Sequence, residues 1–163
     1  DERAAAFARL TAALRQFQSE YSQHDPAERV TAEWSAQDVL RHVTSWHRYY
    51  VANLDAEAHG ARFVFPAIKY SQLNQEGVET LRGASDEVLV ETLNEAHRQL
   101  GELVLSGKVT EMTYRAGAKP YPLLKFIEVV EGHIKGHSTS LTRARGKGKP
   151  DSRTGAGAPP ASP

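Results

Sequence analysis

Residues 34–43 read WSAQDVLRHV and mark the start of a long amphipathic helix. Ser35 followed by Asp38 matches a capping box, in which the hydroxyl and the carboxylate each accept a hydrogen bond from a backbone amide at the helix start. Apolar residues then recur every three or four positions, as on one face of a helix: Val39, Val43, Trp46, Tyr50 and Leu54. The pattern predicts a helix from position 35 to His59 and Gly60, where glycine tolerates a left-handed cap.

Three further stretches show the same helical spacing, at 2–22, 85–106 and 120–144. The segments between them are expected to form a short helix, an ordered loop and a polar connection, at 70–82, 60–70 and 108–119. Four long helices joined by long middle connections predict an all-α protein, a four-helix bundle.

The composition indicates one globular domain without a strong electric field. The chain has 163 residues, of which 40% are hydrophobic, and this is enough for one sizeable core. Basic and acidic residues number 20 each, so the net charge gives no reason to expect nucleic acid or an anionic membrane as a partner. The absence of cysteine excludes disulfides and thiolate metal sites. No apolar run approaches the roughly 20 residues that span a bilayer, and we expect a cytoplasmic protein.

The composition changes after Leu141. Arginine and lysine follow, and then glycine, proline, alanine and serine continue to Pro163. Such a segment has too little apolar surface to offset its chain entropy. We therefore expect a bundle domain over 1–145 and a disordered basic tail over 146–163.

Two histidines stand four positions apart in the last predicted helix. His133 and His137 therefore lie on one helix face, and Val130 extends that face as an apolar stripe. His42 lies on the apolar stripe of the helix that begins at Ser35. A single inward histidine is usually an ordinary hydrogen-bonded core residue. Two adjacent buried imidazoles need separate partners unless they share an ion, so the pair indicates a metal site.

The expected site has histidine ligands only. Three neutral imidazoles leave a coordination position open, which is typical of catalytic rather than structural zinc sites. Nitrogen ligands suit several divalent metals, and we expect zinc or nickel. Asp38, one turn before His42, either orients the second ring nitrogen of that histidine or only completes the helix cap. Aromatic side chains are expected to line the pocket for a small-molecule ligand: Trp46, Tyr50 and Tyr70.

The remaining histidines are expected to lie outside the metal site. His47 follows His42 by five positions, about 140° further round the helix, so it should not reach the same ion. His24, His59 and His97 are expected to be solvated.

Two glycines accompany the paired histidines in the last helix. Gly132 and Gly136 each cost the helix about 1 kcal/mol relative to alanine. Because they are four positions apart, they lie on one face of the helix and form a strip without side chains. A neighbouring helix, a second subunit or a bulky ligand could pack closely against this strip. Close helix packing is the ordinary explanation, and a homodimer is an alternative.

Three segments carry a resemblance to a known superfamily. The stretch WSAQDVLRHV with Trp46 resembles the second-helix signature of the DinB/YfiT-like superfamily. Phe-Pro at 65–66, Ile-Lys-Tyr at 68–70 and Leu-Asn at 73–74 are similar to the ClbS/DfsB family within it. The segment EGHIKGH at 131–137 resembles the HxxxH segment of the superfamily. The similarity covers roughly residues 5–145.

The resemblance implies a bacterial protein with an up-down-down-up bundle and a metal-binding cleft at one end of the helices. The metal ligands would be His42, His133 and His137. The superfamily includes thiol-dependent transferases and isomerases, and the ClbS/DfsB branch includes a hydrolase that disarms a genotoxic natural product. Tyr70 and Ile134 depart from that branch, which often has Trp and Tyr at these places.

Our leading hypothesis is a metal-binding pocket protein that acts on, or sequesters, a small reactive or toxic molecule. Its chemistry would be that of a hydrolase or of a thiol-dependent transferase or isomerase. Two alternatives stay open: a resistance protein that binds its ligand without catalysis, and a structural or oligomerising bundle.

Overall fold

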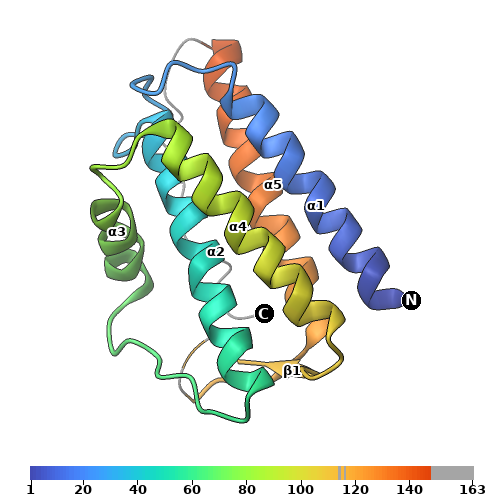
Figure 1. Ribbon diagram of the computed structural model, residues 1–163. Coiled ribbons are helices and arrows are strands. Elements are labelled where there is room, and N and C mark those ends of the chain that lie inside the picture. Colours follow the sequence, from blue (N-terminus) through green and yellow to red (C-terminus); the bar gives the residue numbers. More distant parts are fainter. Residues whose placement is uncertain (114, 116, 148–163) are drawn as a thin grey trace.

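The computed structural model describes residues 1–113, 115 and 117–147 (Figure 1). The elements are α1 (Glu2–Tyr21), α2 (Ala36–Ala58), α3 (Tyr70–Thr80), α4 (Asp86–Leu105), β1 (Glu111–Met112), β2 (Tyr121–Pro122) and α5 (Leu123–Lys147). Four long helices dominate, and the all-α prediction is confirmed. The predicted tail at 146–163 lies, from position 148 on, outside the described residues.

Polar contacts at the helix ends fix the helix directions. Arg145 near the end of α5 binds Glu20 near the end of α1, so these two helices are parallel. Gln37 at the start of α2 donates to Asp86 at the start of α4, so this pair is parallel as well. Tyr21 at the end of α1 also donates to Asp86, which makes α1 antiparallel to α4. In Figure 1, α1 and α5 rise from the end where β1 lies, while α2 and α4 descend toward it.

The predicted apolar stripes meet in one core. The stripe of α2 is almost fully buried, with Val39, Val43, Trp46, Tyr50 and Leu54 at most 3% exposed. α2 packs mainly on α4, and α1 packs mainly on α5. Burial of these stripes supplies most of the stability of such a bundle, because helix propensity alone is weak.

The short helix α3 packs on α2. A Cβ atom at Gly77 would lie 2.2 Å from Ser45 Oγ and 2.9 Å from its Cβ, so only glycine permits this close approach. The contact is fixed by a hydrogen bond of 2.7 Å from the Trp46 indole nitrogen to Asn74 Oδ1. α3 thereby covers the face of α2 that carries Trp46.

A small hairpin replaces part of the predicted polar connection. Met112 in β1 pairs with Tyr121 in β2, and Pro122 is the last strand residue. The predicted start of the last helix at Pro120 is therefore wrong: α5 begins at Leu123. Proline lacks an N–H group but can end an edge strand, and Pro120 and Pro122 accordingly lie before and at the end of β2 rather than in the first turn of α5.

Among the described residues, nothing packs closely on the two glycines of α5. Gly132 and Gly136 are exposed, and a Cβ atom at either would meet nothing within 4 Å. The expectation of close helix packing at this strip is wrong for the described residues. A second subunit and a bulky ligand remain as predicted explanations.

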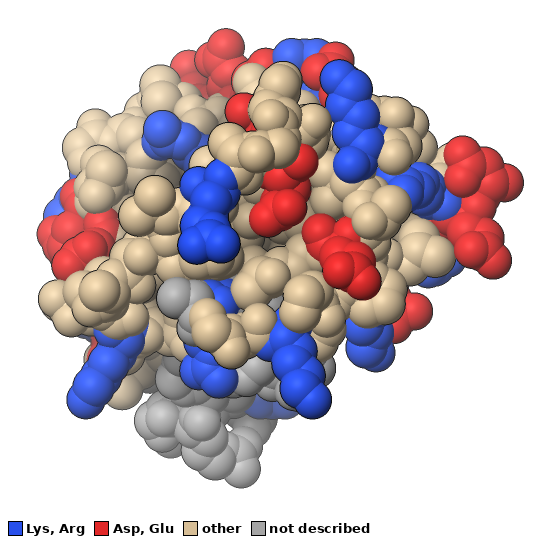
Figure 2. Space-filling model, turned by 90° about the horizontal axis from the view of Figure 1, so that it is seen from below, with Lys and Arg blue, Asp and Glu red and all other residues tan. Residues whose placement is uncertain are grey.

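The described surface is mixed in charge. Figure 2 shows lysine and arginine side chains interspersed with aspartate and glutamate at the end of the bundle that carries β1. Among the described residues, no helix is long and apolar enough to cross a membrane.

Candidate metal centre

Three histidine side chains from two helices meet inside the bundle. His42 Nε2 lies 3.2 Å from His133 Nε2, and His137 Nε2 lies 2.8 Å from the same atom. All three ligand atoms lie within 4.8 Å of one another. α2 provides His42 from its second turn, and α5 provides the other two from successive turns. The structure thus brings together the three histidines that the sequence singles out.

The donor set fits one metal ion. Each neutral imidazole nitrogen offers either one N–H group or one lone pair, so three converging Nε2 atoms cannot satisfy one another. One cation accepts all three lone pairs. Nitrogen ligands bound tetrahedrally at about 2.1 Å lie about 3.4 Å apart. The observed separations of 2.8 and 3.2 Å approach this value, so small ring movements suffice.

Burial keeps these imidazoles neutral. His42 is fully buried, His137 is 4% exposed, and His133 is half-buried. Burial lowers the pKa of His137 to about 4, and it lowers the pKa of His42 and His133 well below the usual value, with repulsion between the histidines adding to the effect. The neutral ring is the form that binds a metal, so no deprotonation cost opposes binding at pH 7.

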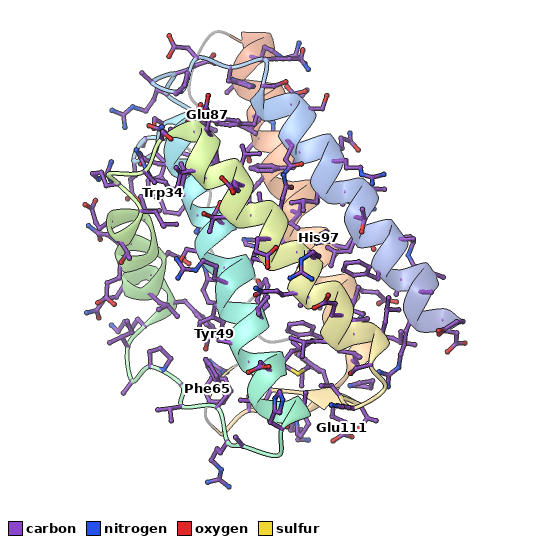
Figure 3. All side chains as sticks on the ribbon, in the orientation of Figure 1. Trp34, Tyr49, Phe65, Glu87, His97 and Glu111 are labelled. Carbon is purple, nitrogen blue, oxygen red and sulfur yellow. The ribbon has the colours of Figure 1, made fainter. Side chains whose placement is uncertain are left out.

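Two of the three outer ring nitrogens lack, among the described residues, the protein partners that metal ligands usually have. His42 Nδ1 and His137 Nδ1 are buried and have no hydrogen-bond partner among the described residues. The indole ring of Trp34 packs instead on the His42 ring, with centroids 4.7 Å apart. Figure 3 shows Trp34 near the start of α2. Ring packing, rather than a hydrogen bond to Nδ1, therefore supports this side of His42.

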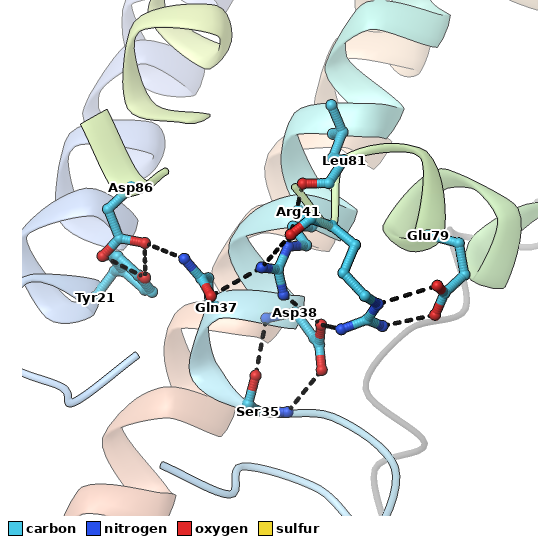
Figure 4. A network of polar contacts seen from close by, with 9 residues as sticks. Tyr21, Ser35, Gln37, Asp38, Arg41, Glu79, Leu81 and Asp86 are labelled. Carbon is cyan, nitrogen blue, oxygen red and sulfur yellow. Dashed lines mark hydrogen bonds and ion pairs between the residues drawn. The ribbon is translucent and has the colours of Figure 1, made fainter. Parts of the chain in front are cut away.

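Asp38 belongs to a separate polar network (Figure 4). The predicted capping box with Ser35 is confirmed, since each side chain accepts from the backbone amide of the other. Asp38 Oδ1 also accepts from Arg41 at 2.8 Å and from Arg82 at 3.2 Å. Burial alone would raise the pKa of Asp38, but the hydrogen bonds of Ser35 and Arg41 and the charge of Arg82 lower it. No hydrogen bond joins Asp38 to His42, so its contacts are those of a helix cap and of ion pairs with Arg41 and Arg82.

Replacing Asp38 with alanine is expected to lower the free energy of unfolding by about 2–4 kcal/mol, because the cap is lost and the buried Arg41 loses its carboxylate. Metal affinity is expected to stay within about threefold, since the carboxylate does not touch His42. Urea unfolding and zinc titration measure the two effects. Asp55→Ala, on the exposed side of α2, is the control. A large loss of zinc affinity in D38A alone would show that Asp38 orients the ligand.

Aromatic side chains continue along α2 beyond His42. The ring centroid of Trp46 lies 5.7 Å from that of Tyr50 and 6.0 Å from that of Tyr70. Tyr49, which the sequence does not single out, also contacts Trp46, at 4.8 Å, and its ring contacts Phe63, which in turn contacts Phe65; Figure 3 labels Tyr49 and Phe65. Trp46 and Tyr50 are buried, and Tyr70 is half-buried. The three predicted pocket residues therefore form one contiguous cluster.

Three further histidines are buried outside the metal site, and for two of them the sequence predicted solvent exposure. His97 is buried rather than solvated: its Nδ1 lies 3.1 Å from His47 Nε2, and its Nε2 lies 2.8 Å from Thr11 Oγ1. His47 is buried too, but it is not part of the three-histidine cluster. His24 is also buried, between Glu20 and Glu28, so solvation was the wrong expectation there. Periodicity alone gives no signal for the partners of His97, which lie on other helices.

Comparison with known proteins gives one match. The model of the mycothiol maleylpyruvate isomerase N-terminal domain matches residues 3–111. The match includes His42 but ends before His133 and His137, whose place in the site comes from the structure. No curated protein and no solved structure matches the chain significantly. Because the match spans well over half of the 163 residues, the chain belongs to the mycothiol maleylpyruvate isomerase N-terminal domain family, part of the DinB/YfiT-like superfamily.

Proposed function

We propose that this protein binds a divalent metal ion, zinc or nickel, through His42, His133 and His137 and uses it in thiol-dependent chemistry on a small electrophilic molecule. The observation that carries the proposal is the convergence of three buried Nε2 atoms from α2 and α5. The family name supports a low-molecular-weight thiol as the co-substrate. The finer relationship to the ClbS/DfsB family, and with it hydrolysis or resistance, stays a prediction.

The metal, when bound, supplies Lewis acidity and lowers the pKa of a coordinated thiol. The chain itself prepares the ligands. Burial holds the three imidazoles neutral, and the Trp34 ring packs on His42 and keeps it oriented. With three protein ligands, a bound ion would keep a coordination position for a thiol or a water. His133 is the one ligand of the three that is partly exposed.

The proposal is tested in two steps on the full chain. Elemental analysis of the isolated protein, followed by zinc titration, is expected to give one ion per chain and a higher melting temperature. The zinc-loaded protein is then expected to accelerate the reaction of mycothiol or cysteine with monobromobimane. The variant His59→Ala, which removes an exposed histidine, serves as the matched control.

The outcomes separate the alternatives. Metal binding with thiol acceleration supports the proposal. Metal binding without acceleration by any thiol would favour a protein that binds its ligand without catalysis. Absence of bound metal, with an unchanged melting temperature after zinc or nickel addition, would overturn the metal site and the chemistry that depends on it.

A further inference from the structure

The three histidine ligands bring no negative charge to a metal ion. Each binds as a neutral imidazole, and the group formed by His42, His133 and His137 includes no Asp or Glu side chain of the described residues. Other protein sites for divalent ions combine histidine with a carboxylate ligand, which lowers the charge of the centre. A divalent ion held by this donor set would keep its full double positive charge.

The surroundings of the ligands add no negative charge either. Metal-bound histidines commonly donate their second ring N–H to a carboxylate, which raises the basicity of the ligand. Neither His42 Nδ1 nor His137 Nδ1 has a carboxylate partner among the described residues. Burial lowers the pKa of all three histidines, whereas a nearby carboxylate would raise it.

The carboxylates nearest to the ligands along α2 and α5 are already paired with cations. Asp38, one turn before the ligand of α2, accepts from Arg41 at 2.8 Å and from Arg82 at 3.2 Å (Figure 4). Glu131, two positions before the first ligand of α5, is only 8% exposed and pairs with Lys135. These carboxylates are therefore compensated within the chain and do not offset the charge of an ion.

Burial makes an uncompensated charge costly. His42 is fully buried and His137 is 4% exposed, so water screens the centre weakly. An anion at the open coordination position would remove half of the excess charge at bonding distance, whereas a neutral ligand would remove none. Electrostatics at this position therefore favours an anion over a neutral donor.

We propose that the metal-loaded centre selects its exogenous ligand by charge: it binds a small molecule through an anionic donor group, and the neutral His133 sets this preference. His133 is half-buried, so of the three positions this one would desolvate a carboxylate ligand at the lowest cost, yet the chain places an imidazole there. The inference rests on the proposed function, because it requires the ion, and it adds the charge of the group that binds to it.

Cobalt(II) reports on its ligands because its visible spectrum changes with coordination. The full chain loaded with cobalt is titrated at about pH 8 with azide, a small monoanion, and with imidazole, a neutral donor. Azide is expected to change the spectrum and to bind at least about tenfold more tightly than imidazole. This measurement needs no substrate and no turnover.

A charge-changing variant tests the role of His133. His133→Glu lowers the charge of the loaded centre by one, so it is expected to weaken azide binding more than about tenfold and to change imidazole affinity less than about threefold. His59→Glu is the matched control, because it places the same carboxylate at an exposed position about 25 Å along the helix axis from His42. Both affinities are expected to stay unchanged in this control.

The outcomes separate this inference from the proposed function. No cobalt spectrum in the parent chain would overturn the metal site, and the inference with it. A cobalt spectrum with equal or tighter binding of imidazole would overturn the selection by charge and leave the metal site standing. Equal weakening of both probes in H133E would do the same, because altered geometry rather than charge would then explain the loss. If H133E takes up no cobalt, the preference of the parent chain for azide over imidazole decides alone.

Discussion

Zinc affinity is expected to fall more than about 100-fold when His137 is replaced with alanine, because two imidazoles form a much weaker site than three. His137 provides an Nε2 atom 2.8 Å from that of His133, and its ring is buried, so no other described side chain can take its place without a large movement. Isothermal titration of the metal-free protein with zinc measures the affinity. The melting-temperature increase on zinc addition is expected to disappear in the same variant.

His47→Ala distinguishes the loss of a ligand from the loss of a buried histidine. His47 is buried and contacts His97 through a ring nitrogen, but it lies outside the cluster of three. This variant is therefore expected to melt at a lower temperature and still bind one zinc ion. If H47A lost zinc as completely as H137A, or if H137A kept it, the three-histidine site would be wrong.

Acid is expected to unfold the metal-free protein between about pH 6 and pH 4. Five histidines have a lowered pKa in the folded chain: His42, His47, His97, His133 and His137. Burial lowers the pKa of His47 to about 3 and that of His97 to about 4, whereas the unfolded chain binds these protons near pH 6.5. In this interval the unfolded state holds more protons, so the free energy of unfolding decreases as the pH falls.

The size of the effect makes it easy to measure. Each such histidine contributes about 1.4 kcal/mol per pH unit within its interval, and a domain of this size has roughly 5–15 kcal/mol in total. The far-UV circular dichroism signal of the helices, measured as a function of pH, follows the unfolding transition. A double variant, His47→Leu with His97→Leu, removes two of the groups and is expected to move the midpoint to lower pH. A midpoint below about pH 3 in the parent chain, or one that the double variant does not move, would contradict the prediction.

Helix positions could be read from the sequence wherever apolar spacing is long and regular. The predicted first helix at 2–22 corresponds to Glu2–Tyr21, and the Ser35 cap of α2 was identified by its partner Asp38. The hairpin could not be found in this way, because strands of two residues are too short to show alternation. The helical register also placed His42, His133 and His137 on inward faces, and the structure brings them together.

The parts that sequence reasoning missed depend on contacts between distant segments. Burial of His97 comes from Thr11 and from the ring of Phe7, which stacks on it with centroids 4.6 Å apart. Asn53 gives no sequence signal for its burial, which accompanies a hydrogen bond from its side chain to the carbonyl oxygen of Thr113, 60 positions along the chain. Spacing along one helix shows which face a residue occupies, but it does not show what the other helices place opposite that face.

The exposed glycines of α5 have a consequence for how quickly a metal ion held by the three histidines would exchange. Gly132 and Gly136 flank His133, and nothing in the described chain packs on them. Each weakens the helix by about 1 kcal/mol relative to alanine, and the cost falls on the turn that carries His133 and leads to His137. Local opening of this turn therefore requires less free energy than unfolding of the bundle. We expect the ion to enter and leave through such openings, so that the backbone of α5 sets the exchange rate.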